Sequence, residues 1–312
     1  MRKAYAEAVA NLAEKDPRVL FLTADLGFMA LDPFLDRFPD RFLNVGVAEQ
    51  NMIGVATGLA EAGFIPYVYS IATFASLRGY EFIRNGPVRH RLPVRIAGVG
   101  GGFEYGSAGF SHHGLEDLGV MRLQPGLMVV APADSAQARE AVIATQRVPG
   151  PVYFRLGKDD KAVVPGLGGR FELGRAERLR EGGDLLLITV GSIAVEVVAA
   201  ADSLALKGVE ATVLLVSSFN PAPVEDLALA LGAHRLALTV EAHQVSGGLG
   251  SLVAEVIAEN GIGCRLRRCG VRESGQGVGG SQRYLEGRHG ISAAAIAKTA
   301  LAELARVSPL PR

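Results

Sequence analysis

The sequence predicts an α/β protein built from two doubly wound domains with mostly parallel sheets. Short β-branched runs alternate with helical patterns along the chain, which is typical of βαβ units. The 312 residues suffice for about two domains of ordinary size. One segment, 157–174, interrupts the alternation with Gly, Pro, Lys and Asp. We therefore expect a first domain at 1–156, a linker at 157–174 and a second domain at 175–312.

In the first domain, each expected strand is a short apolar or β-branched run, and each expected helix is a longer stretch with a helical pattern. The expected strands are Val19–Thr23, Phe42–Val45, Ile65–Tyr69, Val94–Ala97, Met128–Val130 and Val152–Arg155. The expected helices between them are Ala4–Glu14, Glu49–Glu61, Phe74–Arg84 and Ser135–Thr145. This order implies a mostly parallel sheet covered by helices.

The second domain repeats the same rhythm without repeating the sequence of the first. Its expected strands are Leu185–Val190, Ala211–Val216, Leu236–Val240 and Arg265–Arg268. Its expected helices are Ile193–Leu206, Val224–Leu231, Leu249–Glu259 and Ser292–Leu304. We therefore expect a second α/β unit of the same class.

Composition excludes several classes of partner. Lys plus Arg and Asp plus Glu number 32 each, so the formal net charge is zero and no basic surface for nucleic acid or an anionic membrane is expected. The chain shows no signal-peptide core and no apolar stretch long enough to span a bilayer. Its two cysteines, Cys264 and Cys269, form neither a disulfide framework nor a zinc spacing. We expect a soluble cytoplasmic protein.

One carboxylate stands out by its surroundings. Glu49 opens an expected helix, where an acid is ordinarily a surface residue favoured by the helix dipole. Its neighbours Val47, Ala48, Met52 and Ile53 are apolar, which suggests a buried position. A buried carboxylate is either satisfied by one specific partner or tuned to hold a proton near neutral pH. The residues alone leave a structural and a functional role equally open.

Six segments carry a wider pattern, in this order: Thr23–Leu26, Gly46–Met52, Thr73–Phe74 followed by Arg78 and Tyr80, Gly109–Gly114, Val130–Asp134 and Glu241–Ser251. In this order they resemble motifs of the transketolase family of thiamine-diphosphate enzymes. The resemblance covers nearly the whole chain, but only the second part of a full-length family member. It implies a pyrimidine-binding domain followed by a transketolase C-terminal domain.

The family's diphosphate and metal motif is missing. Full-length members carry a Gly-Asp-Gly motif on an amino-terminal domain, whereas here Gly183-Asp184 is followed by Leu185 and no Gly-Asp-Gly occurs. The chain therefore resembles the C-terminal subunit of a split transketolase. The resemblance implies an N-terminal-type partner subunit that carries the Gly-Asp-Gly site for the diphosphate and Mg²⁺, an α2β2 assembly, and activity only with that partner.

The resemblance also implies roles for residues around the cofactor. Glu49 matches the family glutamate that hydrogen-bonds the aminopyrimidine ring of thiamine diphosphate, which activates the cofactor and requires a dry pocket. Phe74 matches the aromatic residue that stacks on this ring. Asp25 and Leu26, which follow a strand, and Tyr80 are assigned to the same pocket. Helix capping by Asp25 and core packing of Tyr80 remain alternatives.

On the substrate side, His112 matches the histidine that contacts the oxygen of the donor carbonyl. Arg2 and Arg155 match two arginines that grip a sugar phosphate, which suits bidentate guanidinium groups. His113 adjoins His112, but no third ligand at helical spacing supports a metal site. No metal ligand is assigned to this chain.

Three positions depart from the transketolase pattern. Ala108, Gly100 and Met29 stand where the family has an aspartate that reads the donor hydroxyl, a channel histidine and a phosphate-binding serine. Loss of such polar groups changes substrate preference. The glycine-rich run 99–102 is either a flexible loop or a tight turn.

A second glycine-rich run, Gly247–Ser251, has the look of a phosphate loop. The resemblance instead implies that this run packs in the C-terminal domain, away from the chemistry.

The expected function is therefore transfer of a two-carbon ketol unit from a ketose or ketose phosphate to an aldose or aldose phosphate, as in the carbohydrate chemistry of the pentose phosphates. Three alternatives stay open. They are the β subunit of a 2-oxoacid dehydrogenase, a deoxyxylulose-phosphate synthase-like enzyme, which the Ala48-Glu49-Gln50 triplet resembles, and a non-catalytic assembly or regulatory subunit.

Overall fold

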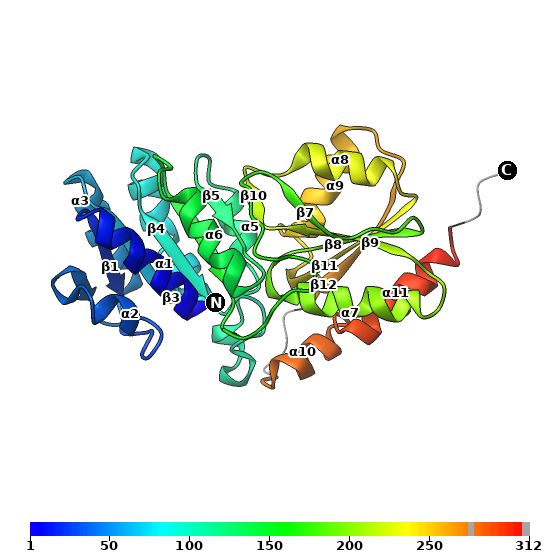
Figure 1. The fold of residues 1–312 in the computed structure, drawn as a ribbon, viewed down its shortest axis with the longest axis horizontal. Helices are drawn as coiled ribbons and strands as arrows, with labels where there is room; N and C mark the ends of the chain where they lie inside the picture. The colour runs from blue at the N-terminus through cyan, green and yellow to red at the C-terminus, as the bar shows by residue number, and fades with distance from the viewer. Residues whose placement is uncertain (274–277, 308–312) are drawn as a thin grey trace.

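Two α/β units lie side by side along the long axis of the molecule, and each is built around its own twisted sheet (Figure 1). The computed structural model describes residues 1–273 and 278–307. The first sheet has the strand order β10-β5-β6-β4-β3-β1-β2, and the second has the order β12-β11-β8-β9-β7. The predicted fold class is confirmed. The predicted second domain ends at 312, and residues 308–312 lie outside the described part of the chain.

The first sheet contains β1 (Val19–Thr23), β2 (Phe42–Asn44), β3 (Ile65–Ile71), β4 (Arg95–Val99), β5 (Met128–Val130), β6 (Val152–Leu156) and β10 (Ser218–Asn220). All neighbours pair in parallel except β10, which runs antiparallel to β5. The helices around it are α1 (Arg2–Lys15), α2 (Asp32–Leu35), α3 (Glu49–Glu61), α4 (Tyr80–Ile83), α5 (Asp117–Arg122) and α6 (Ser135–Thr145).

Successive side chains of each strand enter different cores, as the pleat requires. On one face of the first sheet, Phe21 and Tyr67 pack with α1 and α6. On the other face, Leu22 and Val68 pack with α3 and α4. The strands are therefore buried on both faces, which explains their continuous apolar sequences.

The second sheet contains β7 (Ala176–Arg180), β8 (Leu185–Thr189), β9 (Ala211–Val216), β11 (Leu236–Gln244) and β12 (Arg265–Val271). Its helices are α7 (Ala194–Ala205), α8 (Val224–Gly232), α9 (Leu249–Glu259), α10 (Gln282–Arg288) and α11 (Ala293–Leu304). Helices α7 and α11 cover one face with Leu187 and Leu238, whereas α8 and α9 cover the other with Leu186 and Ile188.

The structure differs from the sequence prediction in two informative places. The strand β10 comes from the second half of the chain, yet it pairs with β5 and extends the first sheet. The second half of the chain therefore contributes one strand to the first sheet. The segment Phe74–Arg84, predicted as one helix, is divided into a π-helical turn at Phe74–Arg78, the short α4 and a second π-helical turn at Arg84–Val88. Pro87 lies in that second turn and lacks the N–H of a regular helix.

A buried ion pair within the first unit holds an arginine that also bonds the second unit. Arg155 at the end of β6 and Asp117 at the start of α5 are 5% and 1% exposed, and the Arg155 Nε lies 3.0 Å from the Asp117 carboxylate. The Arg155 Nη2 donates to the carbonyls of Gly114 and Ala242, each at 2.9 Å. Because Ala242 belongs to β11, this guanidinium connects the sheet of the first unit to that of the second.

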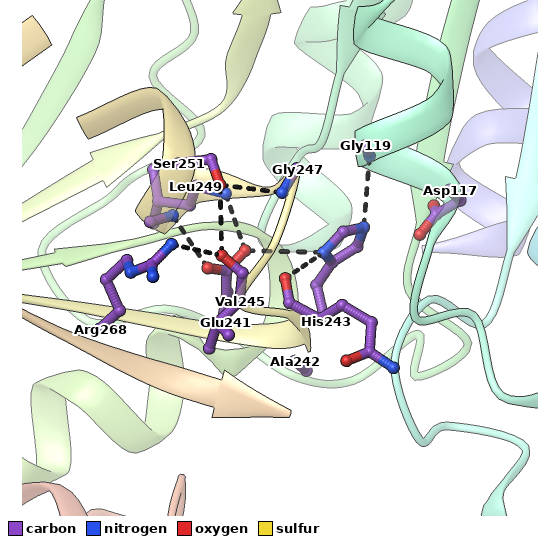
Figure 2. A network of polar contacts seen from close by, with 12 residues as sticks. Asp117, Gly119, Glu241, Ala242, His243, Val245, Gly247, Leu249, Ser251 and Arg268 are labelled. Carbon is purple, nitrogen blue, oxygen red and sulfur yellow. Dashed lines mark hydrogen bonds and ion pairs between the residues drawn. The ribbon is translucent and has the colours of Figure 1, made fainter. Parts of the chain in front are cut away.

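A second polar network lies beside it (Figure 2). The Nε2 atom of His243, on β11, accepts a hydrogen bond from the backbone N–H of Gly119 on α5, at 3.3 Å. Its Nδ1 lies 2.7 Å from the carbonyl of Gln244. Burial lowers the pKa of His243 to about 4, so the imidazole is neutral at pH 7. The neutral ring can therefore donate from Nδ1 and accept at Nε2, which satisfies both nitrogens inside this contact.

The glycine-rich run Gly247–Ser251, at the start of α9, is bonded to the same strand, β11, through Glu241. The buried carboxylate of Glu241 accepts the N–H groups of Leu249 and Gly250 at 2.7 and 2.9 Å (Figure 2). Burial raises the pKa of Glu241 to about 7, although these two N–H groups oppose the shift. The helix N-terminus is thus already bound by a protein carboxylate, which supports packing rather than phosphate binding for Gly247–Ser251.

We predict that Arg155→Met destabilises the folded chain by about 3–5 kcal/mol, because Asp117 would keep a buried charge without its cation. The measurement is the free energy of unfolding in denaturant. Arg139→Met is the control, since Arg139 is 46% exposed and pairs at 3.6 Å with an exposed Glu7. Equal, small losses in both variants would contradict the role of Arg155 as the tie between the units.

Candidate functional site

The candidate site lies where β1, β2 and β3 end, at the carboxyl edge of the first sheet. Glu49 opens α3 a few residues after β2, Ser70 is near the end of β3, and Phe74 follows β3 directly. Ligands of open α/β sheets collect at this edge, because the loops that leave parallel strands meet there. The fold therefore brings together side chains that are separated in the sequence.

Glu49 is buried, with 1% of its surface exposed. Both carboxylate oxygens are bound. The Ser70 hydroxyl donates to Oε1 at 2.9 Å, and the Arg78 Nη1 donates to Oε2 at 3.0 Å. Ser70 is fully buried, whereas the Arg78 side chain is 44% exposed. One oxygen is thus fixed from inside the protein, and the other is bound by a group that reaches in from solvent.

Phe74 opens the π-helical turn Phe74–Arg78 and contacts the arginine that binds this carboxylate. The Arg78 guanidinium carbon lies 4.2 Å from the centre of the Phe74 ring, within the range of a cation–π contact. The wider turn brings residues 74 and 78 to the same side, and single π-turns often occur at functional sites. Glu49, Arg78 and Phe74 therefore form one contiguous group.

His112 continues the group on the far side of Phe74. The two rings meet edge to face, with centroids 5.0 Å apart. The Ser111 Oγ lies 3.0 Å from the His112 Nδ1, and the ring of Tyr105 lies 6.3 Å away. His113 points elsewhere: it is buried, and its Nε2 lies 3.2 Å from the carbonyl of Gly106.

Tyr105 fills the space left by Gly100. A Cβ at Gly100 would lie 2.2 Å from the Tyr105 ring, and the φ of Gly100 is +77°. In the same turn, a Cβ at Gly101 would lie 2.5 Å from Arg155. The run 99–102 is therefore a tight turn with close neighbours, as one of the two sequence interpretations proposed.

Two cations lie near Tyr105. The Lys158 ammonium is 4.7 Å from the centre of the Tyr105 ring, and the Arg2 Nε donates to the Lys158 carbonyl at 3.1 Å. Arg2 also lies 3.8 Å from Asp160, and its side chain is 28% exposed. Arg2 thus lies at the outer end of a row that runs through Lys158, Tyr105 and His112.

The other predicted cofactor residues are bonded to other parts of the first unit. Asp25 is exposed and has a positive φ of 58°; its carboxylate accepts from Asn44 at 3.0 Å. Leu26 is held to Thr23 through its backbone. The Tyr80 hydroxyl donates to the Val120 carbonyl at 2.9 Å, which fixes it against α5. Their roles in a cofactor pocket stay predictions.

Arg155, predicted to bind substrate, is also bonded inside the protein. Its guanidinium is committed to Asp117 and to two carbonyls inside the protein. The bonds to these partners use the Nε and Nη2 donors, and Arg155 is only 5% exposed, so this geometry does not favour the predicted grip on a substrate phosphate. The role in substrate binding stays a prediction, and the observed role is structural.

The site is open on its apolar side. Large apolar side chains on the loops around it are exposed: Phe28 by 89%, Val47 by 71%, Phe110 by 53% and Leu77 by 45%. A buried carboxylate beside an aromatic face and uncovered apolar surface fits the pyrimidine ring of thiamine diphosphate. Among the described residues, no group of three or more His, Cys, Asp or Glu side chains is arranged to hold a metal.

Sequence reasoning did not assign Ser70, Tyr105 or Lys158 to the site, and it used Arg78 only as part of a motif. Arg78 could have been found from its spacing of four residues from Phe74. Ser70 carries no local signal, because its contact with Glu49 joins two separate segments of the chain. Tyr105 lies five residues after Gly100, so its packing against that glycine is a local contact.

No helix within residues 1–273 and 278–307 is long and apolar enough to cross a membrane.

Comparison with known protein families and sequences identifies the family of this chain. Residues 1–162 match the transketolase pyrimidine binding domain, and residues 174–296 match the transketolase C-terminal domain. The chain is 35% identical to one of the subunits of the apulose-4-phosphate transketolase of Actinobacillus succinogenes, over 96% of each chain. It is 36% identical to the 6-deoxy-6-sulfo-D-fructose transketolase subunit SqwH of a Clostridium species, over 96% of this chain and 93% of that one.

Solved structures agree with this assignment. One, described as a split gene transketolase in an inactive β4 tetramer, superposes with a TM-score of 0.88 at 35% identity and covers 97% of this chain and 98% of that one. The full-length transketolase of Pichia stipitis shares the fold at a TM-score of 0.80 and 17% identity; the chain spans 46% of it. With both domains matched in order and relatives of equal length, this chain belongs to the transketolase family.

Proposed function

We propose that this chain is the C-terminal subunit of a split transketolase that transfers a two-carbon ketol unit from a ketose, or ketose phosphate, to an aldose or aldose phosphate. The observation that carries the proposal is the group formed by Glu49, Phe74 and His112 at the carboxyl edge of the first sheet. Glu49 is buried there, and the large apolar side chains on the surrounding loops are exposed. The relatives of equal length that are named as transketolase subunits support it.

Thiamine diphosphate, on which the family depends, supplies a carbon nucleophile that can accept and release the ketol unit. The residues of this chain bind and orient. Glu49 would exchange a proton with a ring nitrogen of the pyrimidine, and Ser70 would hold its other oxygen in place. Phe74 would offer its ring face to the pyrimidine. His112, with Ser111 at its Nδ1, would donate to or accept from a substrate oxygen through Nε2.

The anionic end of a phosphorylated sugar would lie at the outer end of the row. Lys158 and Arg2 are cations near Tyr105, and Tyr105 lies 6.3 Å from His112. A substrate whose reacting oxygen meets His112 could extend past Tyr105 toward these cations. Lys158 would then supply a point charge for the phosphate, in place of the buried Arg155, whose Nε and Nη2 donors bond inside the protein.

The partner would be an N-terminal-type subunit with the diphosphate and Mg²⁺ ligands, in an α2β2 assembly of the cytoplasm. The exposed apolar side chains around the Glu49 region support such a cover. A related split-gene chain is described as an inactive β4 tetramer, which supports the need for a second kind of subunit.

A deoxyxylulose-phosphate synthase-like activity is the second candidate. The synthase of Desulfitobacterium hafniense is 34% identical to this chain over 83% of it, but the chain spans only 41% of that relative. Incubation of the complete complex with a ketose phosphate or with a 2-oxo acid separates the candidates: release of carbon dioxide from the acid would favour the synthase or a 2-oxoacid dehydrogenase.

Thiamine diphosphate and Mg²⁺ should bind only when the partner is present. The measurement is calorimetric titration of both into the chain alone and into the chain co-purified with its candidate N-terminal-type partner. A tight site on the lone chain would contradict the split-site proposal.

Glu49→Gln in the complex should lower kcat by about 10²–10⁴-fold, because the amide cannot exchange the proton. Glu61→Gln, at the exposed end of the same helix, is the matched control. Transfer of the ketol unit is followed with a coupled assay, and unfolding curves confirm that both variants fold. Unchanged turnover in the Glu49 variant would rule out its role in activation.

Lys158→Met should raise KM for a phosphorylated ketose by about tenfold and leave kcat within about threefold, since one charge-assisted contact is lost. Lys161→Met, at a nearby exposed position, serves as the control. An unphosphorylated ketose should show no difference between the variants. Equal KM values for the phosphorylated sugar in both would contradict the assignment.

A further inference from the structure

Arg78 makes both of the contacts that the pyrimidine ring would need in the proposed function. Its Nη1 donates to the Glu49 Oε2 at 3.0 Å, and its guanidinium lies 4.2 Å from the centre of the Phe74 ring. The same carboxylate oxygen and the same aromatic side chain are the groups proposed to hydrogen-bond and stack on the cofactor. Occupancy of these groups by Arg78 and by the cofactor is therefore mutually exclusive.

The chemistry of the two groups explains this overlap. A guanidinium is planar, carries N–H donors in its plane and stacks on aromatic rings. An aminopyrimidine is also planar, can share a proton with a carboxylate and presents a flat face to an aromatic ring. Arg78 thus imitates the pyrimidine in the two interactions by which this chain would recognise it.

Glu49 needs such a substitute when no ligand is bound. A carboxylate that is 1% exposed has lost its hydration, and the Ser70 hydroxyl binds only one of its oxygens. A buried charge without a partner is costly. Arg78 supplies the missing charge and donor.

Arg78 is also suited to leave. Its side chain is 44% exposed, so the charged end can return to water without crossing the protein. Besides Glu49, Arg78 contacts the face of the Phe74 ring. Within the described part of the chain, no second carboxylate pairs with it.

We propose that Arg78 is an internal competitor that determines the affinity of this chain for thiamine diphosphate. It occupies the Glu49 and Phe74 contacts in the cofactor-free subunit and withdraws to solvent when the pyrimidine enters. This inference rests on the proposed function, because the ligand that displaces Arg78 is the cofactor of that function. Arg78 is a positioning residue here, not a catalytic one.

The first test asks whether the pair forms in the free chain. The variants are Arg78→Met, which keeps an apolar stem, and Arg84→Met as a control on the next turn, where the guanidinium bonds the adjacent Asn85. Without the cation, one oxygen of the buried Glu49 carboxylate loses its donor, which costs stability. The loss in Tm of Arg78→Met relative to wild type should therefore be larger than the loss in Arg84→Met.

The control variant isolates this contact, because Arg84 bonds Asn85 and not Glu49. A loss in Tm of Arg78→Met equal to that of Arg84→Met would overturn the proposal.

The second test measures competition. Thiamine diphosphate with Mg²⁺ is titrated into the complete complex formed with wild-type, Arg78→Met, Arg78→Lys or Arg84→Met chains. Removal of the competitor should tighten binding about threefold to tenfold in Arg78→Met, with Arg84→Met at the wild-type value. Arg78→Lys keeps the charge but loses the planar group, so its affinity should lie between the two.

The outcomes separate the inference from the function on which it rests. If wild type binds and Arg78→Met binds equally or more weakly, the competitor role is wrong while the proposed function stands. If no sample binds thiamine diphosphate, the proposed function fails and the inference fails with it. Tighter binding in Arg78→Met alone supports both.

Discussion

One constraint governs the site: a carboxylate, Glu49, is held out of water at the carboxyl edge of a parallel sheet. Its side chain is buried on the same helix as Met52 and Ile53, and its orientation follows from Ser70 on β3. Such a group must be paired, protonated or bound to a ligand, because an isolated buried charge is too costly. The exposed Arg78 satisfies this constraint in the free chain, and the pyrimidine of a cofactor would satisfy it in the complex.

The seam between the two units supports this site from behind. Arg155 and Asp117 fix the end of β6 and the start of α5 against β11, and Tyr80 bonds the backbone of α5 from the segment that follows Phe74. The C-terminal unit therefore helps to determine where the turn with Phe74 and Arg78 lies. This explains, in physical terms, why a domain that carries none of the proposed catalytic residues accompanies the one that does.

The sequence was sufficient for the fold class and for most strands, since buried parallel strands such as β1 and β8 have continuous apolar runs. It was not sufficient for β10, a three-residue strand whose pairing with β5 is long-range, or for the π-helical turns. In the site, Glu49 could be found from its apolar neighbours. The contacts of Ser70 and Arg155 could not, because each depends on how distant segments pack.

The most direct measurement is an experimental structure of this chain in complex with its partner, thiamine diphosphate and Mg²⁺. The proposed function predicts the Glu49 carboxylate within hydrogen-bonding distance of a pyrimidine ring nitrogen, the Phe74 ring against the pyrimidine, and the Arg78 guanidinium withdrawn from both. A pyrimidine held entirely by the partner chain, with the Glu49–Arg78 pair intact, would contradict it.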